Sequence, residues 1–201
     1  MARRGRPRAF DRDEALASAA RVFWEKGYEG ASLDDLLLAM GGISPPSFYA
    51  AFGSKEALFF EAAKLYASTI GRRPVRALEL APTAREGIEA MLRASVDIFC
   101  GGDTPRGCMV QLGAINCAPA SRAVEDRMRA YRVRVRSLIR ERLERAVAEG
   151  DLPPGLDLEP LTSLYSAVAQ GMPIQARDGA SREQLFAAVE GAMAAWDNLI
   201  G

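Results

Sequence analysis

The stretch GGISPPSFYAAFGSKEAL, residues 41–58, has the pattern of a turn, a very short helix, a second turn and the start of a longer helix. Gly41 and Gly42 give the backbone the freedom that a tight turn needs. Ser44 stands where an N-cap belongs, and Pro45 follows at the first helical position, where its missing N–H costs nothing. The sequence therefore predicts a short helix that begins at Pro45.

Two aromatic residues anchor this short helix. Phe48 and Phe52 are four residues apart and so share one face of it. Isolated helices below about 12–15 residues are marginal in water, so this helix depends on that packing. Gly53 ends it, and Ser54 caps the next helix. The remaining side chains point away from the core, and a short exposed helix of this kind fits the major groove of DNA.

The composition is that of an ordinary globular protein, with 201 residues of which 49% are apolar and 26% charged. No apolar run approaches the roughly 18 residues of a membrane span, and no apolar stretch of signal-peptide type follows the basic N-terminus. The 3 cysteines are an odd number, which argues against a disulfide framework. We expect a cytoplasmic protein with no membrane contact.

The chain contains no histidine, which excludes most zinc and di-iron sites and every His-based catalytic arrangement. Asp34 and Asp35 could belong to a metal-binding acidic cluster, but acids in the first turn of a helix are the ordinary interpretation of such a pair. We therefore expect neither a metal nor a cofactor.

Basic residues crowd the N-terminus although the formal net charge is zero. The first eight residues contain no acid and include Arg3, Arg4, Arg6 and Arg8. Residues 1–10 are either a solvated tail or a basic arm that lies along phosphates or in a minor groove. Beside a helix that enters DNA, we favour the arm.

Two further helices precede the short one. Asp11 and Glu14 have the spacing of a capping box and open a helix that Gly27 ends. Ser32 caps a second helix, with Asp35 three residues later. Three helices in about fifty residues, the second and third joined by a tight glycine turn, make a helix-turn-helix unit with a supporting first helix.

The run FDRDEALASAARVFWEKGYEGASLDDLLLAMGGISPPSFYAAFGSKEALF resembles the DNA-binding domain of the tetracycline-repressor (TetR/AcrR) family. The resemblance rests on Phe23, Gly27-Tyr28, Ser32, Gly42-Ile43-Ser44, Phe48-Tyr49, Phe52 and Ser54-Lys55-Glu56-Ala57-Leu58. It implies an all-α homodimer, with a helix-turn-helix domain over residues 11–56 and a ligand-binding and dimerisation domain over residues 57–201. It also implies repression at an inverted repeat of double-stranded DNA, relieved when a small molecule binds the C-terminal domain.

Site residues follow from the same resemblance. Positions that usually contact phosphates match Ser32, Tyr49 and Lys55, and positions that approach base edges match Ser44, Pro45, Pro46, Ser47 and Ala50. The two prolines and the Ala50-Ala51 pair depart from the commoner family pattern. The predicted recognition helix lacks the Arg, Lys, Asn and Gln that make bidentate base contacts. We expect readout through Ser47, through apolar contacts with thymine methyls, through DNA shape and through the arm.

The rest of the chain has the pattern of further helices. The helix after Ser54 is expected to end between residues 71 and 74, and Thr83 with Glu86 opens another. GCMVQLGAINCA, residues 107–118, is apolar nearly all round and predicts a buried helix. Later helices are expected over about 121–149, 158–176 and 182–199. The first of these is rich in arginine, and we interpret its interleaved acids as a salt-bridged face rather than a second nucleic-acid surface.

The last two helices offer more apolar surface than the outer layer of a monomer needs. Small residues among the apolar ones would let helices approach closely. The ordinary alternative is packing within one chain, but we favour a dimer interface that includes Leu164, Val168, Gly171, Ala187, Gly191 and Met193.

A pocket between the helices of the C-terminal domain would suit a small hydrophobic effector. The candidates for its lining are Met91, Ser95, Phe99, Met109, Leu112, Asn116, Tyr131, Tyr165 and Met172, each of which could instead be core. Cys108 follows Arg106 and opens the predicted buried helix, where a thiolate would be stabilised. It is either a redox or electrophile sensor, with Cys100 as its most plausible disulfide partner, or a small core residue.

These observations predict a DNA-binding transcriptional repressor released from a palindromic operator by a small-molecule effector. The alternative mechanism is a repressor that senses oxidants or electrophiles through Cys108. An enzyme on a helical scaffold is disfavoured because neither histidine nor a nucleophile–base pair is present. An architectural nucleic-acid protein would leave some 140 residues after the helix-turn-helix without a purpose.

Overall fold

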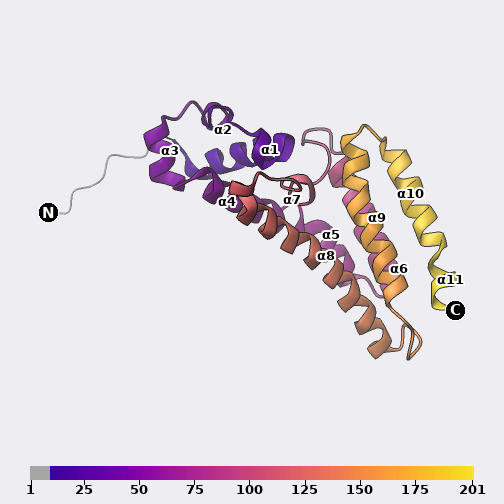
Figure 1. Ribbon diagram of the computed structural model, residues 1–201. Coiled ribbons are helices and arrows are strands. Elements are labelled where there is room, and N and C mark those ends of the chain that lie inside the picture. The colour runs from indigo at the N-terminus through magenta and orange to yellow at the C-terminus, as the bar shows by residue number, and fades with distance from the viewer. Residues whose placement is uncertain (1–9) are drawn as a thin grey trace.

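The computed structural model describes residues 10–201 and, over these residues, contains helices and no strand. The N-terminal unit consists of α1 (Arg12–Gly30), α2 (Leu33–Ala39) and α3 (Pro45–Phe52). Its order and its tight turn before α3 match the helix-turn-helix predicted from the sequence (Figure 1).

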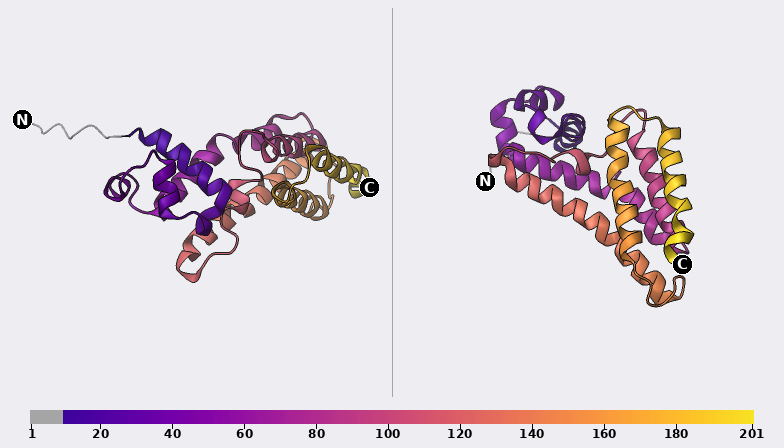
Figure 2. Two further views of the ribbon diagram at one scale, coloured as in Figure 1. Left: turned by 90° about the horizontal axis from the view of Figure 1, so that it is seen from above. Right: turned by 45° about the vertical axis from the view of Figure 1, so that its right-hand side comes forward.

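The rest of the chain is also helical. It contains α4 (Lys55–Ser68), α5 (Arg72–Leu80), α6 (Ala84–Phe99), α7 (Met109–Leu112), a short 3-10 helix (Pro119–Ser121), α8 (Arg122–Glu149), α9 (Glu159–Arg177), α10 (Arg182–Ala194) and α11 (Trp196–Ile200). The α1–α3 unit lies at one end of the molecule and the α9–α10 pair at the other, while α4 and α8 run between them (Figures 1 and 2).

Side-chain caps fix most of the helix starts that the sequence predicts. The Asp11 carboxylate accepts hydrogen bonds from the backbone N–H groups of Asp13 and Glu14. Full capping boxes, in which each side chain bonds the other residue's backbone, are formed by Ser32 with Asp35, Thr83 with Glu86, and Ser181 with Gln184. Such caps contribute about 1 kcal/mol each, so they hold the helix boundaries firmly.

The core is continuous from the N-terminal unit into the C-terminal helices. Phe23 of α1 meets Phe59 of α4 edge to face, with ring centroids 5.0 Å apart. In the same way, Trp24 meets Tyr66 at 4.8 Å. Through this aromatic seam α1 and α4 are packed together as one unit.

Several helix predictions are corrected. The buried helix expected over residues 107–118 is only the four residues of α7, because the backbone on either side of it bonds α1 instead of continuing the helix. The helix from Arg72 to Leu80 is absent from the sequence prediction, and the last predicted helix is divided at Ala195. Gly27 kinks α1, with φ 71° and ψ 177°, and the helix resumes to Gly30.

Candidate nucleic-acid interface and regulatory cavity

Helix α3 is held in place by its two phenylalanines. Phe48 is fully buried and Phe52 is 4% exposed. The Phe10 ring lies 6.5 Å from that of Phe52, and the guanidinium of Arg12 lies 4.6 Å from the Phe52 centroid. Arg12 also forms a 2.7 Å ion pair with Glu61 of α4. The short helix is therefore fixed against both α1 and α4, and its other face is free.

The free face of α3 carries small or aromatic side chains. Tyr49 is 52% exposed. The other exposed positions are Ser44, Pro45, Pro46 and Ala50, whereas Ser47 is half-buried. Ser44 is the N-cap, and its Oγ lies 3.0 Å from the Oγ of Ser47. The surface is thus shallow, without a long polar side chain that could reach into a groove.

The other predicted phosphate contacts lie at helix N-termini, where backbone N–H groups favour anions. Ser32 is the exposed N-cap of α2, and Lys55 is the first residue of α4. Lys55 is half-buried, and its Nζ lies 4.5 Å from the centroid of the Tyr28 ring. Burial lowers the pKa of Lys55, while the carboxylate of Glu29 raises it. The stacked ring gives the Lys55 ammonium a defined position.

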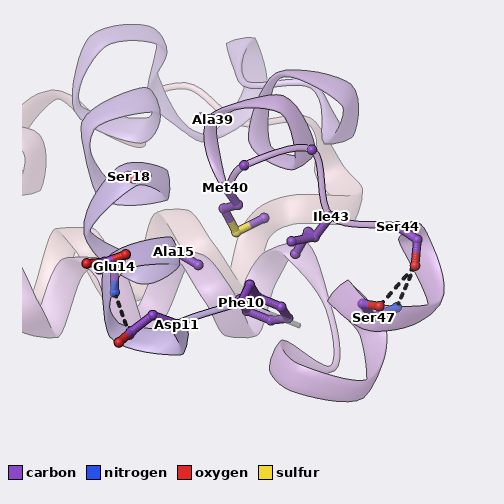
Figure 3. Close-up of a pocket in the computed structure, with 12 residues that line it drawn as sticks. Phe10, Asp11, Glu14, Ala15, Ser18, Ala39, Met40, Ile43, Ser44 and Ser47 are labelled. Carbon is purple, nitrogen blue, oxygen red and sulfur yellow. Dashed lines mark hydrogen bonds between the residues drawn. The ribbon is translucent and has the colours of Figure 1, made fainter. Parts of the chain in front are cut away.

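A hollow of about 610 Å³ lies between the first turn of α1, the α2–α3 turn and the start of α3 (Figure 3). Phe10, Met40 and Ile43 form its apolar floor, and the Asp11 and Glu14 carboxylates stand on the α1 side. Those two carboxylates would repel a phosphate, so we assign no phosphate contact to the hollow. The predicted arm residues Arg3, Arg4, Arg6 and Arg8 lie outside the described residues.

A second, mostly apolar cavity of about 210 Å³ lies among the C-terminal helices. Its lining comes from α4 through α9: Tyr66, Ala67, Gly71, Pro74, Val75, Met91, Ser95, Ile98, Phe99, Cys108, Val110, Gln111, Tyr131, Arg134, Val135, Leu138 and Ala169. Four of the residues proposed from the sequence are among these, namely Met91, Ser95, Phe99 and Tyr131.

Five residues proposed for the pocket lie elsewhere. Tyr165 is fully buried, and its hydroxyl donates to the carbonyl oxygen of Ala192 at 3.2 Å, on the side of α9 that faces α10. Asn116 is exposed because α7 ends before it. Met109 and Met172 are buried in the core. Leu112, the last residue of α7, is half-buried and is not part of the lining.

The cavity residues that the sequence does not suggest come from several elements. Pro74 and Val75 belong to the unpredicted helix α5. Tyr66 belongs to the helix that links the two domains, and Gln111 to a segment expected as core. The polar character of Gln111 in an otherwise apolar segment is the one available signal for it.

Cys108 lines this cavity but is not a stabilised thiolate. The Tyr66 hydroxyl donates a hydrogen bond to Cys108 Sγ at 3.5 Å. Burial raises the pKa of Cys108, although that hydrogen bond and the charge of Arg177 lower it in part. The expected lowering is therefore wrong in sign, because burial outweighs the effect of the start of a four-residue helix. Cys100, Cys108 and Cys117 are all free thiols.

Polar contacts join the wall of the cavity to α1. The indole Nε1 of Trp24 donates to the carbonyl oxygen of Gly107 at 3.1 Å. The guanidinium of Arg177, at the end of α9, donates to the carbonyl oxygens of Trp24 at 2.6 Å and Glu25 at 3.2 Å. The cavity segment and the last helices are thus bonded directly to the helix that supports α3.

The open side of α9 and α10 is lined by small residues. A Cβ added at Gly171 or at Gly191 would meet no heavy atom of the chain within 4 Å. Ala187 is exposed, and Leu164 and Val168 are half-buried. Met193 is only 5% exposed and packs inside its own chain, so it does not belong to this open face.

Several arginines of α8 are paired with acids. Arg140 bonds Glu144 at 2.9 Å, and Arg136 bonds Glu159 of α9 at 2.5 Å. These pairs agree with a salt-bridged solvent face on this helix. None of the helices within residues 10–201 combines the length and the apolar character that crossing a membrane requires.

Comparison with known proteins identifies the family to which this architecture belongs. The protein-family model described as "Bacterial regulatory proteins, tetR family" matches residues 15–62. A second family model, "Tetracyclin repressor-like, C-terminal domain", matches residues 84–192. The HTH-type transcriptional repressor ComR of Escherichia coli is 32% identical over 98% of this chain and 94% of its own length. The repressor BdcR of the same organism is 30% identical over 91% and 87%.

A solved structure extends the likeness to three dimensions. The TetR family transcriptional regulator CifR, as a cysteine mutant complexed with 26-bp double-strand operator DNA, superimposes with a TM-score of 0.92. It is 49% identical, and the alignment covers 96% of this chain and all of the CifR chain. The family resemblance and the all-α helix-turn-helix fold predicted from the sequence are confirmed: the chain belongs to the tetR family of bacterial DNA-binding transcriptional regulators.

Proposed function

We propose that this protein is a homodimeric repressor that binds an inverted-repeat operator and leaves it when a small apolar molecule fills the 210 Å³ cavity. Its relatives ComR and BdcR are named as repressors, and CifR was solved on operator DNA. Two copies joined along the open α9–α10 face would carry two α3 helices, one for each half-site.

The observation that carries the proposal is the geometry of α3. Its buried side is fixed by Phe48 and Phe52, and its outward side presents no packing contact that a groove would have to break. Tyr49, Ser32 and Lys55 stand around it with a hydroxyl or an ammonium that can meet a phosphate. The hydrogen-bonding capacity toward bases is small, so DNA shape supplies much of the selectivity.

Release follows from the position of the cavity. Tyr66 of α4 and Cys108 face it, and the segment that begins at Gly107 is bonded to Trp24 of α1. A molecule that fits the cavity better when α4 has moved stabilises that arrangement, and α1 with α3 moves with it. The two α3 helices of a dimer then lose the spacing of the operator.

The test is a gel-shift titration of the purified protein with DNA from upstream of its own gene. We expect a shifted band at an inverted repeat with half-site centres about 34–36 Å apart, or a multiple of that spacing. Small apolar compounds should abolish the shift. A protein that retards all sequences equally, with or without added compounds, would contradict the proposal.

A second mechanism is favoured by one observation, the exposure of Cys108 to the cavity. An activated alkene that enters can take the thiol across its double bond, so that Sγ bonds one carbon and the proton goes to the other. The raised pKa of Cys108 slows this step, but a hydrophobic reagent is concentrated beside the sulfur.

Mass spectrometry and the gel shift decide between the two mechanisms. With the covalent mechanism, a small activated alkene should add to Cys108, as located by peptide mass spectrometry, and release the DNA, and Cys108→Ser should prevent the release even if the more exposed Cys100 and Cys117 still react. If the compound releases DNA from Cys108→Ser to the same extent as from wild type, the covalent mechanism is refuted and the non-covalent mechanism is supported.

A further inference from the structure

One buried side-chain oxygen among the residues that line the cavity has no hydrogen-bond partner. Gln111 is 9% exposed, and its Nε2 donates to the carbonyl oxygen of Ala169 at 3.3 Å. Its Oε1 is buried and accepts no hydrogen bond. Gln111 and Ala169 both line the cavity. An unpaired buried carbonyl oxygen is rare in a native protein and calls for a physical explanation.

A proline determines which end of the Gln111 side-chain amide has no hydrogen-bond partner. In a regular helix the carbonyl oxygen of Ala169 would accept the N–H of the residue four positions later. That residue is Pro173, inside α9, which has no N–H. The carbonyl of Ala169 therefore takes Gln111 Nε2, and an amide turned the other way would place two oxygens face to face. Oε1 is the atom that remains.

Three other polar side chains of the lining, those of Ser95, Tyr66 and Arg134, are already engaged, whereas the half-buried Tyr131 hydroxyl forms no hydrogen bond within residues 10–201. The Ser95 hydroxyl donates to the carbonyl oxygen of Met91 at 2.8 Å, and the Tyr66 hydroxyl donates to Cys108 Sγ. Arg134 is bonded to Glu141. Among the described residues that line the cavity, Gln111 Oε1 is the buried side-chain oxygen that lacks a donor.

We propose that the cavity selects small neutral molecules that carry a hydroxyl or an N–H group, and that Gln111 Oε1 accepts the hydrogen bond. This inference rests on the proposed function, in which the cavity is the effector site. A carboxylate would meet the negative end of the Gln111 carbonyl dipole. A cation would find no carboxylate in the lining, and a buried charge without a partner is strongly disfavoured.

The volume of the cavity limits the size of the molecules that it can hold. Pockets for drug-sized molecules measure about 300–1,000 Å³, and an apolar cavity of about 150 Å³ holds benzene. The volume here, about 210 Å³, fits a single ring with one small substituent. Phenol and toluene are therefore suitable probes, because they have nearly the same shape and only phenol donates a hydrogen bond.

The experiment is calorimetric titration of the full-length protein with each probe. Wild type should bind phenol at least about ten times more tightly than toluene, since a site built around an acceptor discriminates against an analogue without the donor. Gln111→Met should bring the two affinities together, mainly by weakening phenol. Gln170→Met is the matched control, because it makes the same change at a half-buried position of α9 outside the lining, and it should keep the preference.

The wild-type comparison alone can overturn the inference, even if Gln111→Met does not fold. Equal affinity for the two probes, no binding of either probe at millimolar concentration, or a preference that survives Gln111→Met would each do so. The gel shift separates this result from the proposed function. If the protein lacks the phenol preference but still binds operator DNA and releases it when other compounds are added, the proposed function stands and only this inference fails.

Discussion

The backbone N–H of Tyr28 donates a 2.7 Å hydrogen bond to the carbonyl oxygen of Gly113. Tyr28 lies just beyond the kink in α1, and Gly113 follows directly after α7, which lines the cavity with Val110 and Gln111. The bond ties the supporting helix of the DNA-binding unit to the regulatory domain. It exists because α1 turns at Gly27 and so directs an N–H group outward.

The first prediction concerns Gly27. Its φ is +71°, and a Cβ would lie 3.2 Å from the carbonyl oxygen of Gly113. This backbone conformation is essentially restricted to glycine, and forcing another residue into it costs on the order of 1–3 kcal/mol. Gly27→Ala should lower the free energy of unfolding by about that amount, measured by urea denaturation.

Gly30→Ala is the matched control. It lies in the same helix, has no positive φ, and its Cβ would be 3.6 Å from the nearest side-chain atom. Alanine is favoured over glycine in a helix by about 1 kcal/mol, so this variant should be neutral or more stable. Equal destabilisation by both changes would show that the kink is not a constraint.

The second prediction concerns the dimer. Gly191→Glu places a charge on the open α9–α10 face without a clash inside its own chain. Since a desolvated unpaired charge opposes association, the variant should sediment as a monomer and lose operator binding. Ala130→Glu, at an exposed position of α8, should remain dimeric. A wild type that is monomeric at micromolar concentration would refute both the interface and the paired half-sites.

The third prediction concerns DNA affinity. Tyr49→Phe removes only a hydroxyl from the exposed side of α3 and should weaken binding to all sequences alike, by about tenfold, because a phosphate contact carries no sequence information. Fluorescence anisotropy on operator and unrelated duplexes measures this. Tyr131→Phe, in the regulatory cavity, should leave both affinities of the unliganded protein unchanged.

The arm is tested by the salt dependence of the same assay. Deleting residues 1–8 removes four arginines. For every phosphate that these arginines neutralise, the deletion should reduce the slope of log affinity against log salt by about one. An unchanged slope would identify these residues as a tail that does not touch DNA.

The fourth prediction is a pH dependence at the start of α2. Hydrogen bonds from Lys26 and from Ser32 lower the pKa of Asp35 from 3.8 to about 2. A carboxylate whose pKa is lowered on folding stabilises the native state above its unfolded pKa, and this contribution disappears as pH falls through the folded value. The melting temperature of wild type should therefore exceed that of Asp35→Asn above about pH 4, and the difference should shrink between about pH 4 and pH 2. A constant difference would contradict this linkage.

The helix-turn-helix can be predicted because its signals are local. Ser32, Ser44 and Ser54 are caps that act on residues three positions away, and the Phe48–Phe52 pair needs only helical spacing. Because Phe48 and Phe52 mark the buried side of α3, the remaining residues can be assigned to its exposed side. Which of its residues touch DNA stays a prediction, since it depends on a partner outside the chain.

The regulatory domain is harder to predict because its boundaries are set by contacts distant in sequence. Helix α5 follows Gly71 without a side-chain cap, so no local signal marks its start. Residues 107–118 are apolar enough for a buried helix, but periodicity cannot separate a buried helix from a buried irregular segment. Here the bonds from Trp24 and Tyr28 decide the outcome.

The shallow outer side of α3 has a consequence for how such a protein can change over time. Pro46 and Ala50 are exposed, and the stability of α3 comes from Phe48 and Phe52 on the opposite side. Larger polar residues can therefore replace the small ones without disturbing the packing. The preference for one operator can drift, or be redirected in the laboratory, while the regulatory half of the molecule is inherited intact.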